Sequence, residues 1–134
     1  MTKRICFALV AAAGLFAASA QAQTPSKSTD CLRLGQVWGF SAVKGNDRSF
    51  VVTDRANRRF RVNLTHRCGG IDFNLAVGFK TLETGPLACI SRGDTVISHD
   101  PGVAGDMCPI SSVERYTPAM EAADKAAAAA QNGR

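Results

Sequence analysis

The stretch Ser49–Leu64, SFVVTDRANRRFRVNL, is the clearest indication of the fold in the chain. Apolar and polar residues alternate on both sides of a short polar segment, and successive side chains of a strand point to opposite faces. The two runs therefore predict paired strands with one apolar face, made by Phe50, Val52, Phe60, Val62 and Leu64. Between them, Asp54–Arg58 contains Asp and Asn, which favour turns, so the stretch predicts a β-hairpin.

The other face of this hairpin is basic. Arg59 and Arg61 alternate with the apolar residues of the second strand, and Arg48 lies at the base. The planar arginine fork binds carboxylate or phosphate through two hydrogen bonds, which lysine cannot do. We predict that four arginines form a binding surface for anionic groups: Arg55, Arg58, Arg59 and Arg61. The alternative is a solvated strand face, with arginine stems covering the sheet and nearby aspartates neutralising part of the charge.

The segment Met1–Ala22 has the three parts of a secretory signal peptide. Lys3 and Arg4 form a charged start, an apolar run Ile5–Phe16 follows, and small residues precede a cleavage point after Ala22. The apolar run is shorter than the roughly 20 residues that span a membrane. We therefore predict an exported protein, periplasmic or secreted, without a transmembrane segment in the mature chain.

Removal of the signal peptide changes the charge and the cysteine count. Taking 22 residues from 134 leaves 112, and the loss of two basic residues leaves 14 against 11 acidic ones, a net charge of +3. This mild charge does not by itself indicate a nucleic-acid partner. Single-stranded nucleic acids stack on exposed aromatic side chains, and Phe50 and Phe60 are expected to point inward, so the basic face has no such aromatic surface. The partner classes that fit are anionic envelope components and acidic proteins.

Four cysteines remain in the mature chain: Cys31, Cys68, Cys89 and Cys108. An even number in a small exported protein predicts two disulfides. Their gaps of 37, 21 and 19 residues lack the close pairs typical of a zinc site. Three pairings are possible. We favour Cys31–Cys108 with Cys68–Cys89, because the first and last strands of a small closed sheet often meet.

The remaining pattern predicts one small all-β domain over 31–116, preceded by a flexible lead over 23–30. Short apolar runs alternate with turn-forming clusters, and no convincing internal helix interrupts them. About six short strands would form a small barrel or a rolled antiparallel sheet. Besides the hairpin, strands are expected at Cys31–Val43, Ile71–Val77, Leu87–Ser91, Thr95–Ser98 and Cys108–Tyr116.

The tail 117–134 has a different composition, since eight of its 18 residues are Ala. Thr117 can cap a helix that has Pro118 at its first position. Met120 is the only large apolar side chain of the tail, so the sequence gives no stripe for packing. We expect a fraying helix or a disordered tail rather than a docked amphipathic helix.

Candidates for catalysis are few, and we predict a non-enzymatic protein without a cofactor. His66 and His99 are the two histidines, and the loop aspartates Asp94, Asp100 and Asp106 could join them in a small enzyme site or bind Ca²⁺. No G-x-S-x-G motif supports a serine nucleophile, and oxidised cysteines cannot act as thiolates. We therefore expect ordinary loop histidines and turn-forming aspartates, with a small periplasmic enzyme or a purely structural envelope protein as alternatives.

The order of these features resembles an uncharacterised family of small exported bacterial proteins, a domain of unknown function with four cysteines. The residues that carry the resemblance are the four cysteines, the two strands of the hairpin, Ile71, Gly93-Asp94 and Pro109-Ile110. It covers Cys31–Tyr116. The resemblance implies a fold and a compartment, and it implies no chemistry.

Overall fold

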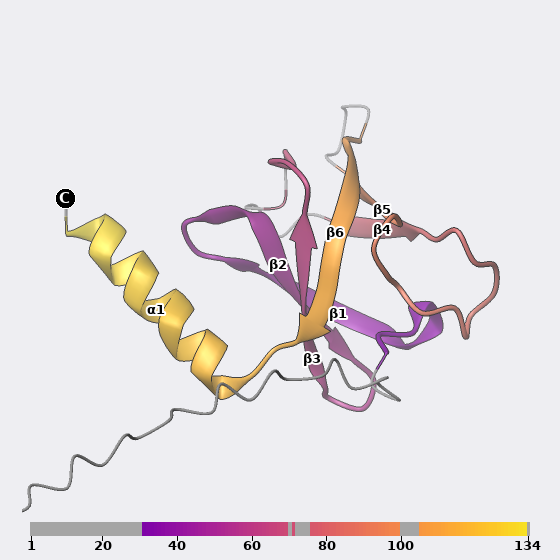
Figure 1. Ribbon diagram of the computed structural model, residues 1–134, viewed down its shortest axis with the longest axis horizontal. Helices are drawn as coiled ribbons and strands as arrows, with labels where there is room; N and C mark the ends of the chain where they lie inside the picture. Colours follow the sequence, from indigo (N-terminus) through magenta and orange to yellow (C-terminus); the bar gives the residue numbers. More distant parts are fainter. Residues whose placement is uncertain (1–30, 70, 72–75, 100–104, 134) are drawn as a thin grey trace, which may run out of the picture.

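The computed structural model describes residues 31–69, 71, 76–99 and 105–133 (Figure 1). The predicted signal peptide, its cleavage point and the flexible lead lie outside the described residues, as does most of the expected strand Ile71–Val77. The elements are η1 (Leu34–Gln36), β1 (Val37–Val43), β2 (Asn46–Asp54), β3 (Arg59–Leu64), β4 (Ala76–Lys80), β5 (Thr95–His99), β6 (Met107–Arg115) and the helix α1 (Pro118–Asn132).

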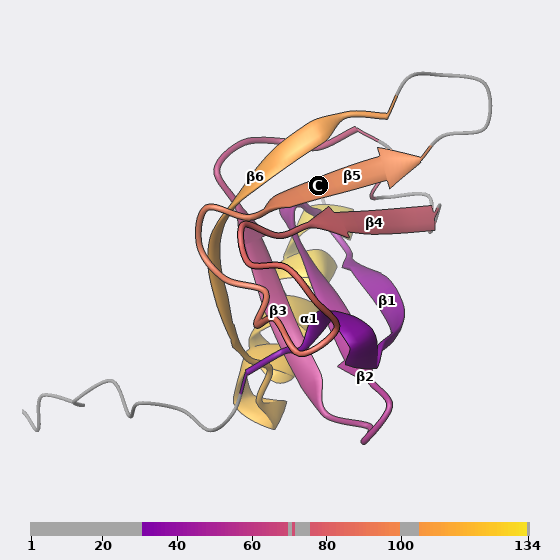
Figure 2. The same cartoon turned by 90° about the vertical axis from the view of Figure 1, so that its right-hand side faces the viewer.

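Six antiparallel strands form a single sheet in the order β1-β2-β3-β6-β5-β4. The sheet curls into a half-barrel, and α1 lies outside it beside the β1–β2 hairpin (Figures 1 and 2). This confirms the predicted rolled antiparallel sheet. The strand expected at Leu87–Ser91 is wrong: the segment makes one isolated bridge, Cys89 to Arg33. The reason is that turns at Pro86-Leu87 and at Arg92-Gly93 enclose the segment and leave too short an extended run for a strand.

The core lies inside the curl of the sheet and confirms the predicted apolar face of the hairpin. Phe50, Val52 and Val62 are fully buried, and Phe60 and Leu64 are nearly so. Leu32, Ile71, Ile90, Val96 and Ile110 complete the same cluster. Burying an aliphatic or aromatic side chain of this size stabilises the fold by about 1.5–3 kcal/mol. The apolar alternation of the hairpin therefore fixes which face of the sheet turns inward.

The predicted disulfide pairing is wrong, although all four cysteines are oxidised. The bonds join Cys31 to Cys89 and Cys68 to Cys108. The prediction assumed that the first and last strands are neighbours, but β6 lies between β3 and β5 in the middle of the sheet. Because β3 pairs with β6, the chain leaving β3 brings Cys68 to Cys108. Cys31 instead lies beside the isolated bridge at Cys89.

Candidate functional site

The tip of the β2–β3 hairpin is held by one buried carboxylate. Asp54 is 1% exposed, and its Oδ1 accepts hydrogen bonds from the backbone N–H groups of Ala56 at 2.9 Å and Arg58 at 2.8 Å. The Nε of Arg58 donates to Asp54 Oδ2 at 2.7 Å. Asn57 takes a φ of 60°, the left-handed conformation expected of a turn Asn. Arg58 therefore holds the turn, and its charge is matched by Asp54.

The same contacts set the ionisation of Asp54. Burial acts to raise the pKa of this carboxyl, but hydrogen bonds from the backbone and side chain of Arg58, together with its charge, lower the pKa below its ordinary value. The carboxylate is thus ionised at neutral pH and remains available to hold the turn.

Arg55 projects from the tip beside an exposed aromatic ring. Its guanidinium carbon lies 5.3 Å from the ring centroid of Trp38, within the range of a cation–π contact. The backbone N–H of Arg55 donates to Gln36 O at 2.8 Å, which ties the tip to η1. Of the four predicted binding arginines, only Arg55 lacks a carboxylate partner among the described residues.

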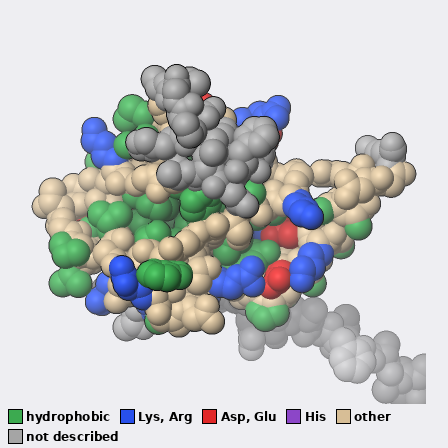
Figure 3. All heavy atoms as spheres, turned by 180° about the vertical axis from the view of Figure 1, so that it is seen from behind, with side chains coloured by type: hydrophobic (Ala, Val, Ile, Leu, Met, Phe, Trp, Pro, Cys, Tyr) green, Lys and Arg blue, Asp and Glu red, His purple; other side chains and the backbone are tan. Residues whose placement is uncertain are grey.

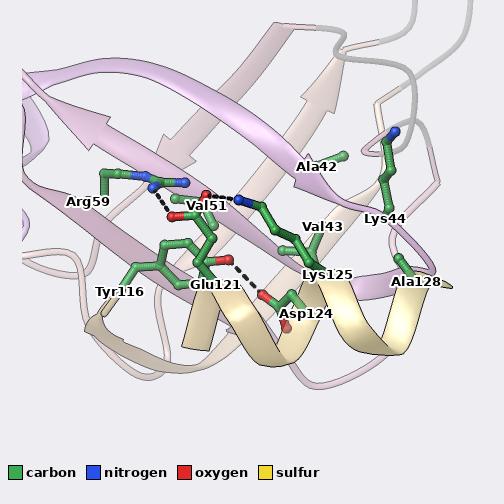
Figure 4. A pocket seen from close by; sticks show the side chains of 10 residues that line it. All are labelled: Ala42, Val43, Lys44, Val51, Arg59, Tyr116, Glu121, Asp124, Lys125 and Ala128. Atoms are coloured by element: carbon green, nitrogen blue, oxygen red, sulfur yellow. Dashed lines mark hydrogen bonds and ion pairs between the residues drawn. The ribbon is translucent and has the colours of Figure 1, made fainter. Parts of the chain in front are cut away.

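Arg59 and Arg61 lie over the ring of Tyr116 and pair with carboxylates of the helix α1. Arg59 Nη1 lies 2.7 Å from Glu121 Oε2, and Arg61 Nη2 forms an ion pair with Asp124. Both guanidinium groups stand over the ring of Tyr116, at 4.8 and 5.2 Å from its centroid. Figure 4 shows Arg59, Tyr116 and the two carboxylates turned toward one another. We call Arg59, Arg61 and Tyr116 the arginine face.

This arrangement corrects the expectation of an exposed basic surface. The side chain of Arg61 is only 16% exposed, because α1 lies over it. Arg67 forms an ion pair with Asp47 at the other end of the hairpin. On the surface seen in Figure 3, the basic side chains are dispersed, with acidic ones between some of them. The arginines thus form two separate groups, one at the tip and one under α1, instead of a continuous ridge.

The tail forms the helix that the capping pattern predicts, and it contacts the sheet through polar groups. The Thr117 hydroxyl accepts a hydrogen bond from Met120 N at 3.3 Å, and Pro118 begins the helix. Glu121 and Asp124 lie on one helix face because they are three residues apart. No residue of α1 is buried. The expected Ala-rich helix without an apolar packing stripe is thus confirmed, and the ion pairs to Arg59 and Arg61, which the sequence did not indicate, join it to the sheet.

Further contacts join α1 to the sheet at its two ends. The Tyr116 hydroxyl donates to Asp124 Oδ2 at 2.8 Å, and Gln131 Nε2 donates to Gly45 O at 3.3 Å in the β1–β2 turn. Burial raises the pKa of Tyr116, and the bond to Asp124 raises it further. Hydrogen bonds from Lys125 and from Arg59 lower the pKa of Glu121. Glu121 is thus suited to remain a charged partner of Arg59.

A groove of about 270 Å³ lies between α1 and the sheet (Figure 4). The sheet side of its lining has Ala42, Val43 and Val51, with Lys44, Arg59 and Tyr116 at the edges, and α1 contributes Glu121, Asp124, Lys125 and Ala128. Outside this lining, two buried polar atoms have no hydrogen-bond partner in the described structure: Arg61 Nε and Ser49 Oγ. Ser49 lies on the same side of β2 as Val51, which pairs with Arg61 in the sheet register.

The residues considered for catalysis take other places. His66 is exposed after β3, where its Nδ1 lies 3.1 Å from the Thr65 hydroxyl. Asp94 is buried and accepts hydrogen bonds from the backbone N–H groups of Leu82 and Ser91, so it organises a loop as a turn-forming residue. Asp106 accepts from Gly69 N. His99 ends β5, and Asp100 lies outside the described residues.

The described residues contain no group of three or more His, Cys, Asp or Glu side chains that could hold a metal ion. Among the helices of the same residues, none combines the length and apolar character needed to cross a membrane.

The sequence was compared with known proteins. A model of a family of unknown function, DUF6491, matches residues 1–132. The chain belongs to the DUF6491 family. No match was found among curated proteins or among solved structures. For this DUF6491 protein, the site must therefore be interpreted from its own geometry.

Proposed function

We propose that this protein is an exported, non-enzymatic binding module that recognises anionic groups through its arginine-rich hairpin. The observation that carries the proposal is the state of Arg61. One of its nitrogens pairs with Asp124, while its buried Nε has no partner in the described structure. A buried donor left unpaired costs about 1–3 kcal/mol, and a bidentate anion would satisfy it.

The arginine face already has the geometry of a carboxylate site. Tyr116 holds both guanidinium groups over one ring, which limits their movement before a ligand arrives. Glu121 and Asp124 supply one carboxylate to each arginine, so α1 acts as an internal anionic ligand. An external ligand with two or more carboxylate or phosphate groups would compete with α1 for the same two arginines.

Other features support the compartment and the absence of catalysis in this proposal. Two disulfides suit a protein that works in an oxidising compartment. The side chains that line the groove include cations, carboxylates and one tyrosine, a set suited to holding charge. Because such a set fits the binding of an ionic ligand, we assign this groove to binding.

The test uses citrate and pyrophosphate as probes, titrated calorimetrically into the full chain at low and high salt. We expect weak, salt-sensitive binding to the natural sequence. Removing the competing charges in Glu121→Gln/Asp124→Asn should tighten binding about tenfold or more, and Arg59→Ser/Arg61→Ser should abolish it.

Two charge-matched variants control this experiment. Glu83→Gln/Asp106→Asn removes two exposed acidic groups outside α1 and its groove, and Arg48→Ser/Arg92→Ser removes two exposed arginines. Both should bind the probes as the natural protein does. Equal gains from the two acidic double variants would show that net charge, and no local site, governs binding and would contradict the proposal.

A further inference from the structure

The tip of the hairpin carries a second surface that is independent of the arginine face. Trp38, the only tryptophan of the chain, is 70% exposed although it belongs to a β-strand. A single exposed aromatic ring is common on protein surfaces, but a ring beside a hollow with polar groups has the composition of a ligand site. A hollow of about 280 Å³ lies beside it, lined by Trp38, Asp54, Arg55 and Asn57.

This surface is fixed in place before any ligand binds. The turn is held by the hydrogen bonds to Asp54, and Arg55 N is bonded to Gln36 O. The guanidinium of Arg55 lies over the Trp38 ring. Asp54 is already occupied by the turn, so Arg55 and Asn57 supply the polar groups that remain for a ligand. Fixing these groups in advance reduces the entropy that binding must overcome.

The chemistry of the three side chains narrows the ligand. A flat indole suits the C–H face of a sugar ring, the Asn57 amide can donate to and accept from hydroxyl groups, and Arg55 can bind a carboxylate through its fork. An acidic peptide would need an enclosed apolar pocket for an anchoring side chain, and this hollow has one exposed ring instead. We propose that Trp38, Arg55 and Asn57 form a binding site for an acidic saccharide, with a uronic acid residue stacked on Trp38.

Because Trp38 is the only tryptophan, its fluorescence reports on this site directly. The experiment titrates the full chain with trigalacturonic acid, with neutral galactotriose and with polyglutamate. We expect a saturable change of the Trp38 emission with trigalacturonic acid and at least a tenfold weaker response to the neutral sugar. Polyglutamate should give no saturable change.

Three variants separate this site from the arginine face. Arg55→Ser should weaken trigalacturonic acid binding at least tenfold, and Arg55→Lys should recover only part of it, because lysine keeps the charge and loses the fork. Arg59→Ser/Arg61→Ser should leave the fluorescence titration unchanged, so failure of the proposed function would not alter this result.

Three outcomes would overturn the inference. They are no response to trigalacturonic acid, an undiminished response in Arg55→Ser, and a response to polyglutamate as strong as that to the acidic sugar. The third would assign the tip to acidic peptides. Calorimetry with Trp38→Ala supplies the remaining test, since loss of the ring should abolish binding of the acidic sugar.

Discussion

The two faces of the β2–β3 hairpin are built from alternate residues of the same strands, yet they are stabilised in different ways. The inner face places Phe50, Val52 and Phe60 in a fully packed core. The outer face places Arg59 and Arg61 against α1 through ion pairs, beside a groove and two unpaired polar atoms. The inner face therefore specifies the fold, while the outer face is held by polar contacts with α1.

The largest expected effect comes from the inner face. Phe60→Ala removes a side chain that is 1% exposed, and truncations of this kind cost about 3–5 kcal/mol. Denaturant unfolding of the variant, with its disulfides intact, measures this loss. A cost below about 1 kcal/mol would show that the inner face is not the packed region of the molecule.

The turn that joins the two faces should show the next largest effect. The Asp54 carboxylate accepts hydrogen bonds from the backbone N–H groups of Ala56 and Arg58 and from the Arg58 side chain. Asp54→Asn removes its negative charge, and we expect the free energy of unfolding to fall by about 2–3 kcal/mol at neutral pH. The measurement is again denaturant unfolding, compared with the exposed control Glu83→Gln.

Asp54 also makes the stability of the protein depend on pH, in a direction that can be predicted. Its pKa in the folded state is lowered, so the unfolded chain binds this proton first as the pH falls. Stability should be fully present above the unfolded pKa near 4 and should decline as the pH falls through the lower folded pKa. Asp54→Asn should flatten this part of the unfolding curve, and an unchanged slope would contradict the assignment.

The outer face should have a smaller effect on stability. Arg61→Ser removes a partly buried partner of Asp124 and should cost about 1–2 kcal/mol, whereas Arg48→Ser, at an exposed position, should cost nothing measurable. A loss as large as that of Phe60→Ala would show that the outer face belongs to the core and would remove the distinction between the faces.

The smallest effect is expected at the helix. Glu121 lies at the surface, and salt screens its contacts with Arg59 and Lys125, so Glu121→Gln should leave the unfolding midpoint unchanged. Hydrogen exchange of the α1 amides should nevertheless become faster, because the helix has no buried residue to hold it in place. Unchanged exchange would show that α1 is held by something other than these ion pairs.

The parts of the structure that depend on period-two alternation could be predicted from the sequence, and those that depend on distant polar contacts could not. Alternation correctly identified the buried side of the hairpin, and Asn57 and Asp54 marked its turn. The disulfide pairing failed because it depends on strand order, and nothing local indicates that β6 enters the middle of the sheet.

The role of the tail was missed for a related reason. Glu121 and Asp124 lie on one face of a helix, and Arg59 and Arg61 lie on one face of a strand, so each carboxylate can pair with one arginine. This complementarity between separate segments has meaning only once the fold brings them together. Tyr116 gave no signal either, since a single aromatic residue after a strand is common. The charge complementarity between hairpin and tail was the one sequence feature that could have indicated their contact.

The central claim is that Arg61 retains a donor for an external anion, and its Nε–H resonance tests this most directly. The measurement is a citrate titration of the ¹⁵N-labelled Glu121→Gln/Asp124→Asn protein, with the signal assigned from its loss in Arg61→Lys. The account predicts a saturable shift of the Arg61 Nε–H signal, with the exposed Arg92 Nε–H unmoved. No shift at Arg61, or equal shifts at both arginines, would contradict it.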